Sequence, residues 1–128
     1  MSAVAALATY ANASAVTASP QEVVRMAYER VITSCNRAEQ AELHQPHNWL
    51  QVFHDETVRG QAILLELTSG LATSHPDPVV TDLANHLEQL YRFAIDQLID
   101  ANLGKDTRPL DAVRMVIGGL LDAWVRAR

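Results

Sequence analysis

The chain has 128 residues, of which 48% are apolar and 20% are charged, and its formal net charge at pH 7 is −5. This length suits one domain with one core, and the apolar fraction argues against general disorder. The negative charge argues against non-specific nucleic-acid binding. A single cysteine excludes an intrachain disulfide, and the sequence holds no apolar run long enough for membrane insertion.

Residues 1–18 are predicted to form an N-terminal arm, mobile or docked, ahead of a helical domain at residues 19–128. The arm is rich in alanine, and its Ala13-Ser14-Ala15 resembles a signal-peptidase site. The first basic residue is Arg25, so the basic region that opens a signal peptide is missing and an arm is favoured.

Tyr10 is the one aromatic residue of this arm. It is a candidate partner-binding residue, and we expect it to act as a lid over a groove of the domain. The alternative is an inert, frayed terminus.

Apolar residues at three- and four-residue spacing predict four helices, at about residues 20–43, 48–72, 78–103 and 109–127. Ser19-Pro20-Gln21-Glu22 has the form of a capping box that opens the first helix. Asn48 and Gln51 suggest a second one. No segment alternates as a strand does. The sequence therefore predicts an all-α fold, an antiparallel up-down four-helix bundle.

The third stretch has the clearest helical period and the broadest apolar face. Asp77 is expected to cap it, with Pro78 in its first turn and Gly104 as a left-handed stop. Such a broad face predicts contact with more than one neighbouring helix.

Three glycines lie inside predicted helices, where each costs about 1 kcal/mol relative to alanine. Close approach of a neighbouring helix would explain Gly60. The pair Gly118-Gly119 indicates a kink, a tight crossing, or a groove in which backbone is left open to a partner.

Residues that carry chemistry are not arranged for catalysis. A di-iron bundle needs Glu-x-x-His on two helices, and none of the five histidines has an acidic residue three positions before it. Cys35 lies on an apolar stripe and is predicted to be a small buried hydrophobe rather than a nucleophile. No phosphate loop, nucleophile elbow or zinc motif is present. The sequence predicts no metal, no cofactor and no enzymatic activity.

Several apolar residues lie beyond the main stripes and are expected to line partner-binding grooves: Val79, Ile95, Ile99 and Met115. Three large aromatics, Tyr28, Tyr91 and Trp124, are candidates for partner contact as well. Aromatics at helical spacing are more often core, so both interpretations stay open for these three.

Three segments resemble the flagellar secretion chaperone FliS family: TASPQEVVRMAYERVI, HLEQLYRFAIDQLIDAN and KDTRPLDAVRMVIGGLLDAW. The matching positions are Ser19, Pro20, Met26, Tyr28, Leu87, Leu90, Tyr91, Leu98, Ala101, Asn102, Asp106, Val113, Ala123 and Trp124. Tyr10 also stands at about the distance before Pro20 of that family's arm tyrosine. His86, Gly60, Glu29-Arg30 and Gly118-Gly119 depart from the family's pattern.

The resemblance implies a cytoplasmic export chaperone that binds the C-terminal segment of flagellin and prevents premature polymerisation. It also implies partners in the flagellar export machinery. A disordered amphipathic segment that folds into apolar grooves suits this role. The alternatives are a helical adaptor for another amphipathic segment, a small bundle enzyme or cofactor carrier, and a structural homodimer.

Overall fold

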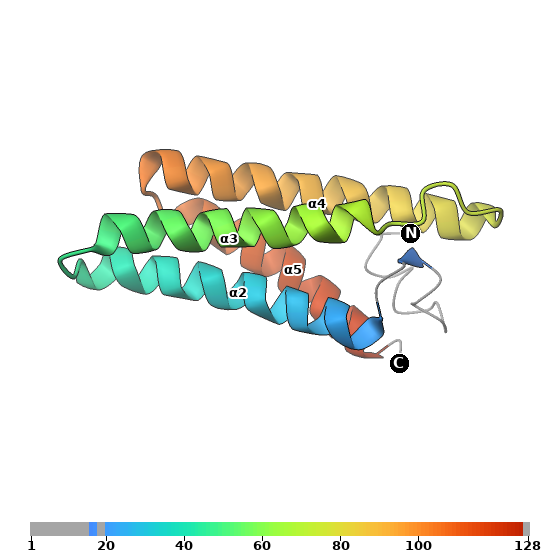
Figure 1. Cartoon of the computed structure of the whole chain (residues 1–128), viewed down its shortest axis with the longest axis horizontal. Coiled ribbons are helices and arrows are strands. Elements are labelled where there is room, and N and C mark those ends of the chain that lie inside the picture. The colour runs from blue at the N-terminus through green and yellow to red at the C-terminus, as the bar shows by residue number, and fades with distance from the viewer. Residues whose placement is uncertain (1–15, 18–19, 127–128) are drawn as a thin grey trace.

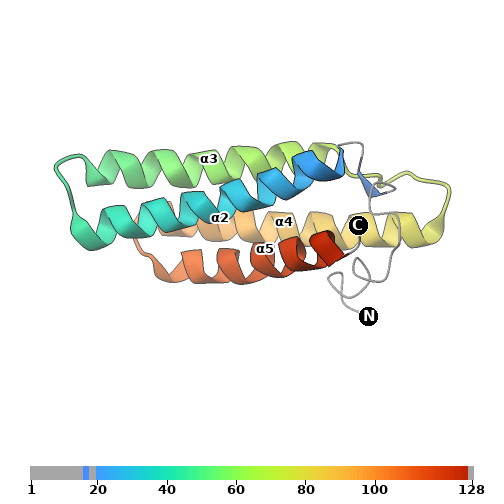
Figure 2. The same cartoon turned by 90° about the horizontal axis from the view of Figure 1, so that it is seen from below.

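The computed structural model describes residues 16–17 and 20–126. Four α-helices account for most of this part of the chain (Figure 1). Their bounds are α2 Gln21–His44, α3 Trp49–Ser69, α4 Pro78–Gly104 and α5 Arg108–Arg126. Consecutive helices run in opposite directions, and α5 returns beside α2 to close the ring (Figures 1 and 2). The all-α four-helix fold is confirmed.

The start of α4 forms as predicted, but its end does not. The Asp77 carboxylate accepts a hydrogen bond of 2.9 Å from the backbone N–H of Val79, with Pro78 in the first turn. Gly104 is not the left-handed stop, because the helix continues through it and Lys105 takes that conformation at φ 48°. The Lys105 N–H bonds to the carbonyls of Ala101 and Asn102, which are otherwise open at a helix end.

The other predicted ends shift by a few residues. The Asn48 side chain makes no cap, and the amide of Gln51 donates to Asp55 at 2.7 Å, so the predicted capping box does not form. Helix α3 ends at Ser69, whose hydroxyl donates to the carbonyl of Glu66 at 2.7 Å. Ser19, the predicted cap of the first helix, lies outside the described residues.

One continuous apolar core runs through the ring, with residues from all four helices. Gly60 on α3 is fully enclosed in it, and a β-carbon built there would lie 2.9 Å from Cδ1 of Leu98 on α4. This confirms that Gly60 allows a close approach of a neighbouring helix. The largest fully buried side chains are Trp124, Tyr28, Tyr91, Phe53, Leu64, Leu87, Leu98, Leu110, Ile117, Leu120 and Val16.

A short N-terminal segment, Val16 and Thr17, is docked at the end of the bundle where α3 passes into α4. The Val16 carbonyl accepts a hydrogen bond of 2.9 Å from the N–H of Ala72, and Thr17 pairs with Leu71 in an isolated antiparallel bridge. Val16 is fully buried and belongs to the core. The predicted boundary of the arm at residue 18 therefore falls just beyond a core residue.

Among the described residues, no helix combines the length and the apolar character that crossing a membrane requires.

Candidate functional site

The large apolar side chains that remain exposed are distributed over all four helices. Each leaves apolar area in water that binding could remove. They are Val23, Met26, Leu43, Leu50, Val58, Leu65, Val79, Phe93, Ile99, Leu103, Met115 and Val125.

Several of these residues follow the seam between α3 and α4. A hydrogen bond of 3.0 Å between the side chains of His54 and Asn102 marks where the two helices meet. Ile99 and Ile95 precede Asn102 by three and seven residues, which places them on the same side of α4. Ile99 is 38% exposed, and Ile95 is half-buried against the core.

The facing side of α3 supplies the second wall of this surface. Val58 and Leu65 follow His54 by four and eleven residues, and Leu50 precedes it by four, so all three share its side of the helix. We call this surface the α3–α4 strip and define it by Leu50, Val58, Leu65, Ile95 and Ile99. It can receive apolar anchors of an amphipathic helix.

Val79 and Met115 do not join the strip. Val79 is 59% exposed in the first turn of α4, sixteen residues from Ile95 and therefore about 24 Å away along the helix. Met115 is 78% exposed on α5. The structure thus leaves both residues accessible but at separate places on the bundle.

The three large aromatics named from the sequence meet in the core. The rings of Tyr28 and Trp124 pack edge to face with centroids 6.1 Å apart, and the indole N–H of Trp124 donates to the Gln21 carbonyl at 3.0 Å. Tyr28, Tyr91 and Trp124 are each at most 2% exposed. This corrects the expectation that they belong to a partner-binding surface, because a partner cannot reach them in this conformation. Tyr10 lies outside the described residues.

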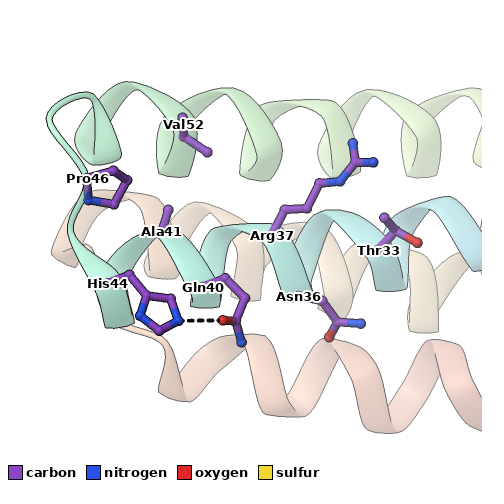
Figure 3. Close-up of a pocket in the computed structure, with 8 residues that line it drawn as sticks. All are labelled: Thr33, Asn36, Arg37, Gln40, Ala41, His44, Pro46 and Val52. Carbon is purple, nitrogen blue, oxygen red and sulfur yellow. Dashed lines mark hydrogen bonds between the residues drawn. The ribbon is translucent and has the colours of Figure 1, made fainter.

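A shallow hollow of about 450 Å³ lies over the second half of α2 and the beginning of α3 (Figure 3). Arg37 extends from α2 toward α3, and Pro46 and Val52 close the end near the α2–α3 loop. The imidazole Nε2 of His44 lies 3.0 Å from the amide oxygen of Gln40. The lining residues are Thr33, Asn36, Arg37, Gln40, Ala41, His44, Pro46 and Val52.

The glycine pair of α5 does not lie at a tight crossing of helices. Helix α5 continues through Gly118 and Gly119, and a β-carbon built at either one would meet no atom within 4 Å. This geometry rules out the tight crossing and fits an open stretch of backbone.

The described residues offer little catalytic chemistry. Burial raises the pKa of the Cys35 thiol to about 12, so the thiol stays protonated and unreactive at neutral pH. Within the described part of the chain, no three His, Cys, Asp or Glu residues come together as a metal site.

The hollow was not predictable from the sequence, because its lining on α2 is a stripe of mostly polar residues and a search for apolar periodicity does not detect it. Val16 was not predictable either, because an isolated valine in an alanine-rich arm gives no periodic signal. The hollow forms only because α2 and α3 lie side by side, and Val16 is buried only because the segment of Val16 and Thr17 docks on the bundle.

The family profile described as "Flagellar protein FliS" matches residues 3–128, which is nearly the whole chain. A comparison with curated protein sequences found no match.

Proposed function

Because the chain belongs to the FliS family, whose members are flagellar export chaperones, we propose that it binds the C-terminal segment of flagellin. Binding takes place in the cytosol and hides the surfaces through which flagellin subunits polymerise. Release follows when the complex reaches the flagellar export machinery. This role needs no cofactor, no metal and no catalytic step.

The observation that best supports this proposal is the α3–α4 strip. Its apolar side chains project from α3 and α4, and the buried core between these helices fixes their relative position before a client binds. A disordered client segment gains helix as it lays residues at i, i+3 or i+4, and i+7 along the strip. Ile95 and Ile99 lie at the centre of this contact, and Val79 and Met115 provide further contacts for a client that wraps around the bundle.

Calorimetric titration with a synthetic peptide tests this function. The peptide is the last forty or so residues of the flagellin from the same organism. We expect one-to-one binding in the submicromolar range and a gain of helix by circular dichroism. The absence of binding to the folded protein would contradict the proposal.

The Ile99→Ser variant tests the location of the site. Ile99 is partly exposed, so its replacement should lower the affinity about tenfold with only a small change in melting temperature. Ile95→Ser should weaken binding too, with a larger loss of stability, because Ile95 packs against the core. Phe93→Ser is the matched control, since Phe93 is 42% exposed on the same helix but outside the strip.

A second candidate is a helical adaptor for a different amphipathic segment, which would use the same strip. Binding of an unrelated amphipathic helix with equal affinity would favour that alternative. A tight dimer that ignores added peptide would favour a structural homodimer instead.

A further inference from the structure

The hollow on α2 differs from the α3–α4 strip in its charge. Its lining includes no acidic side chain, and Arg37 is its one permanent cation. The chain as a whole carries a net charge of −5. The surface that faces the hollow is otherwise almost entirely apolar, and the amide oxygens of Gln40 and Asn36 already pair with His44 and Arg114. The hollow is therefore suited to an occupant that is negatively charged at one point.

Arg37 has donors to spare. Its nearest acidic partner is Glu56, at 3.8 Å from Nη1, and Glu56 also pairs with Arg30 at 3.3 Å. The Glu56 side chain is only 13% exposed, whereas that of Arg37 is 56% exposed. One carboxylate thus serves two arginines, and the guanidinium of Arg37 can still bind a second carboxylate in two-pronged fashion.

The rest of the hollow presents an apolar surface. Ala41 forms part of its floor and is nearly buried, and Val52 and Pro46 form the wall at the α2–α3 loop. Its volume of about 450 Å³ leaves room for aliphatic side chains beside the charged group. The required ligand combines an apolar end with a carboxylate, which is the chemistry of a peptide's C-terminus.

We propose that the hollow receives the C-terminal end of the client, with its α-carboxylate on Arg37 and its last apolar side chain against Ala41, Pro46 and Val52. The inference rests on the proposed function, in which the client is a C-terminal segment. A helical segment of about forty residues spans roughly 60 Å, more than the length of one helix of the bundle. Such a segment can follow the α3–α4 strip and cross α3 to the hollow.

Two synthetic peptides that differ only in the C-terminal group test this inference. One is the flagellin C-terminal peptide with a free carboxylate, and the other carries a C-terminal amide. On the unmodified protein we expect the amide to bind about tenfold more weakly, because it loses a charge-assisted hydrogen bond. The difference should shrink at high salt, since the contact is partly exposed.

The Arg37→Gln variant completes a double-variant cycle. It should weaken the free-acid peptide about tenfold and should not discriminate between acid and amide. Arg37→Lys should recover part of the discrimination as a point charge. Arg59→Gln is the matched control, since Arg59 is exposed on α3 and does not line the hollow; it should leave both affinities within twofold of the unmodified protein.

The outcomes separate this inference from the function on which it rests. Equal binding of acid and amide by the unmodified protein overturns the assignment of the C-terminus and leaves the chaperone function standing. An Arg37→Gln variant that weakens both peptides equally also overturns it, because Arg37 would then bind a side-chain carboxylate. Binding of neither peptide contradicts the chaperone function and this inference together.

Discussion

The hydroxyl oxygens of Tyr28 on α2 and Tyr91 on α4 lie 2.5 Å apart in the centre of the bundle. These helices are not neighbours in the ring, since each packs against α3 and α5. The hydrogen bond therefore spans the core, with one hydroxyl donating and the other accepting, so that neither oxygen lacks a partner where water is excluded. A directional bond in an apolar core also favours one alignment of the two helices over others.

Removing one hydroxyl should cost more than removing both. Tyr28→Phe or Tyr91→Phe leaves the other hydroxyl buried without a partner, and we expect each to lower the free energy of unfolding by about 1–3 kcal/mol. The double variant replaces both partners and should recover part of that loss. Urea unfolding of the four proteins measures the coupling; additive losses would show that the two hydroxyls do not depend on each other.

The stability of the fold should fall at alkaline pH. Burial raises the pKa of Tyr28 well above its ordinary value of 10 and that of Tyr91 to about 12, and it raises the pKa of the Cys35 thiol to about 12. The unfolded chain releases these protons near pH 9–10, whereas the folded protein retains them. Their stabilising contribution is thus complete below about pH 9 and is lost as the pH rises toward 12.

Urea unfolding between pH 8 and 11.5 measures this loss. We expect the free energy of unfolding to decrease by on the order of 1 kcal/mol per pH unit for each group. A variant with Tyr28→Phe, Tyr91→Phe and Cys35→Ala serves as the control, because it lacks all three of these groups. Identical pH profiles for the two proteins would contradict the assignment to these three groups.

The glycines of α3 and α5 should respond in opposite ways to alanine. Gly118→Ala and Gly119→Ala gain about 1 kcal/mol of helix propensity each, since the added methyl group meets no atom within 4 Å. Gly60→Ala should not stabilise the fold, because its methyl would lie 2.9 Å from Cδ1 of Leu98, a fully buried side chain that would have to shift. Thermal unfolding compares the three variants; stabilisation by Gly60→Ala would show that Leu98 can shift.

The helices were predictable from sequence because apolar residues recur at three- and four-residue spacing within each of them. The stripe of α4 and the Asp77 cap are local signals, and both hold in the structure. Helix ends were less predictable. At the end of α4, a left-handed glycine at 104 was expected, yet Lys105 takes that place and its ammonium reaches the Asn102 side chain at 2.5 Å.

The candidate site was only partly predictable, for a reason that follows from geometry. Periodicity shows that a residue lies on an apolar face, but it does not show whether another helix covers that face. Tyr28 and Ile99 both carry apolar signals, and only the assembled ring makes the first fully buried and the second 38% exposed. Whether Arg37 is free to bind a ligand depends on its distance from Glu56, which lies about twenty residues away on another helix. No local sequence pattern encodes that distance.

Ser34 should be replaceable without loss of stability. Its hydroxyl is buried between helices and has no hydrogen-bond partner, so it is desolvated without compensation. Ser34→Ala should leave the free energy of unfolding unchanged or raise it by about 1 kcal/mol. Thr57→Val is the contrast, because the Thr57 hydroxyl donates to backbone carbonyls at 3.0–3.1 Å and its loss should cost about 1 kcal/mol. Clear destabilisation by Ser34→Ala would point to a partner such as a buried water.

The arm should separate into a structural part and a part that affects binding, with the division just before Val16. Val16 is fully buried, so Val16→Ala in the full chain should lower the free energy of unfolding by about 2 kcal/mol. Deleting residues 1–15 spares Val16 and should leave helix content and melting temperature nearly unchanged. If Tyr10 acts as a lid, the same deletion should raise the affinity for the client peptide, because the client no longer competes with the arm.

Circular dichroism and calorimetric titration of the full chain and of the chain without residues 1–15 test the lid. Tyr10→Ala is a more specific variant, and Leu7→Ala is its matched control in the same arm. A lid requires the Tyr10→Ala variant to reproduce most of the effect of the deletion while Leu7→Ala reproduces little of it. Unchanged client affinity after the deletion would exclude the lid and leave the arm with a structural role alone, through Val16. A deletion that melts the bundle would instead show that residues before Val16 contribute to the core.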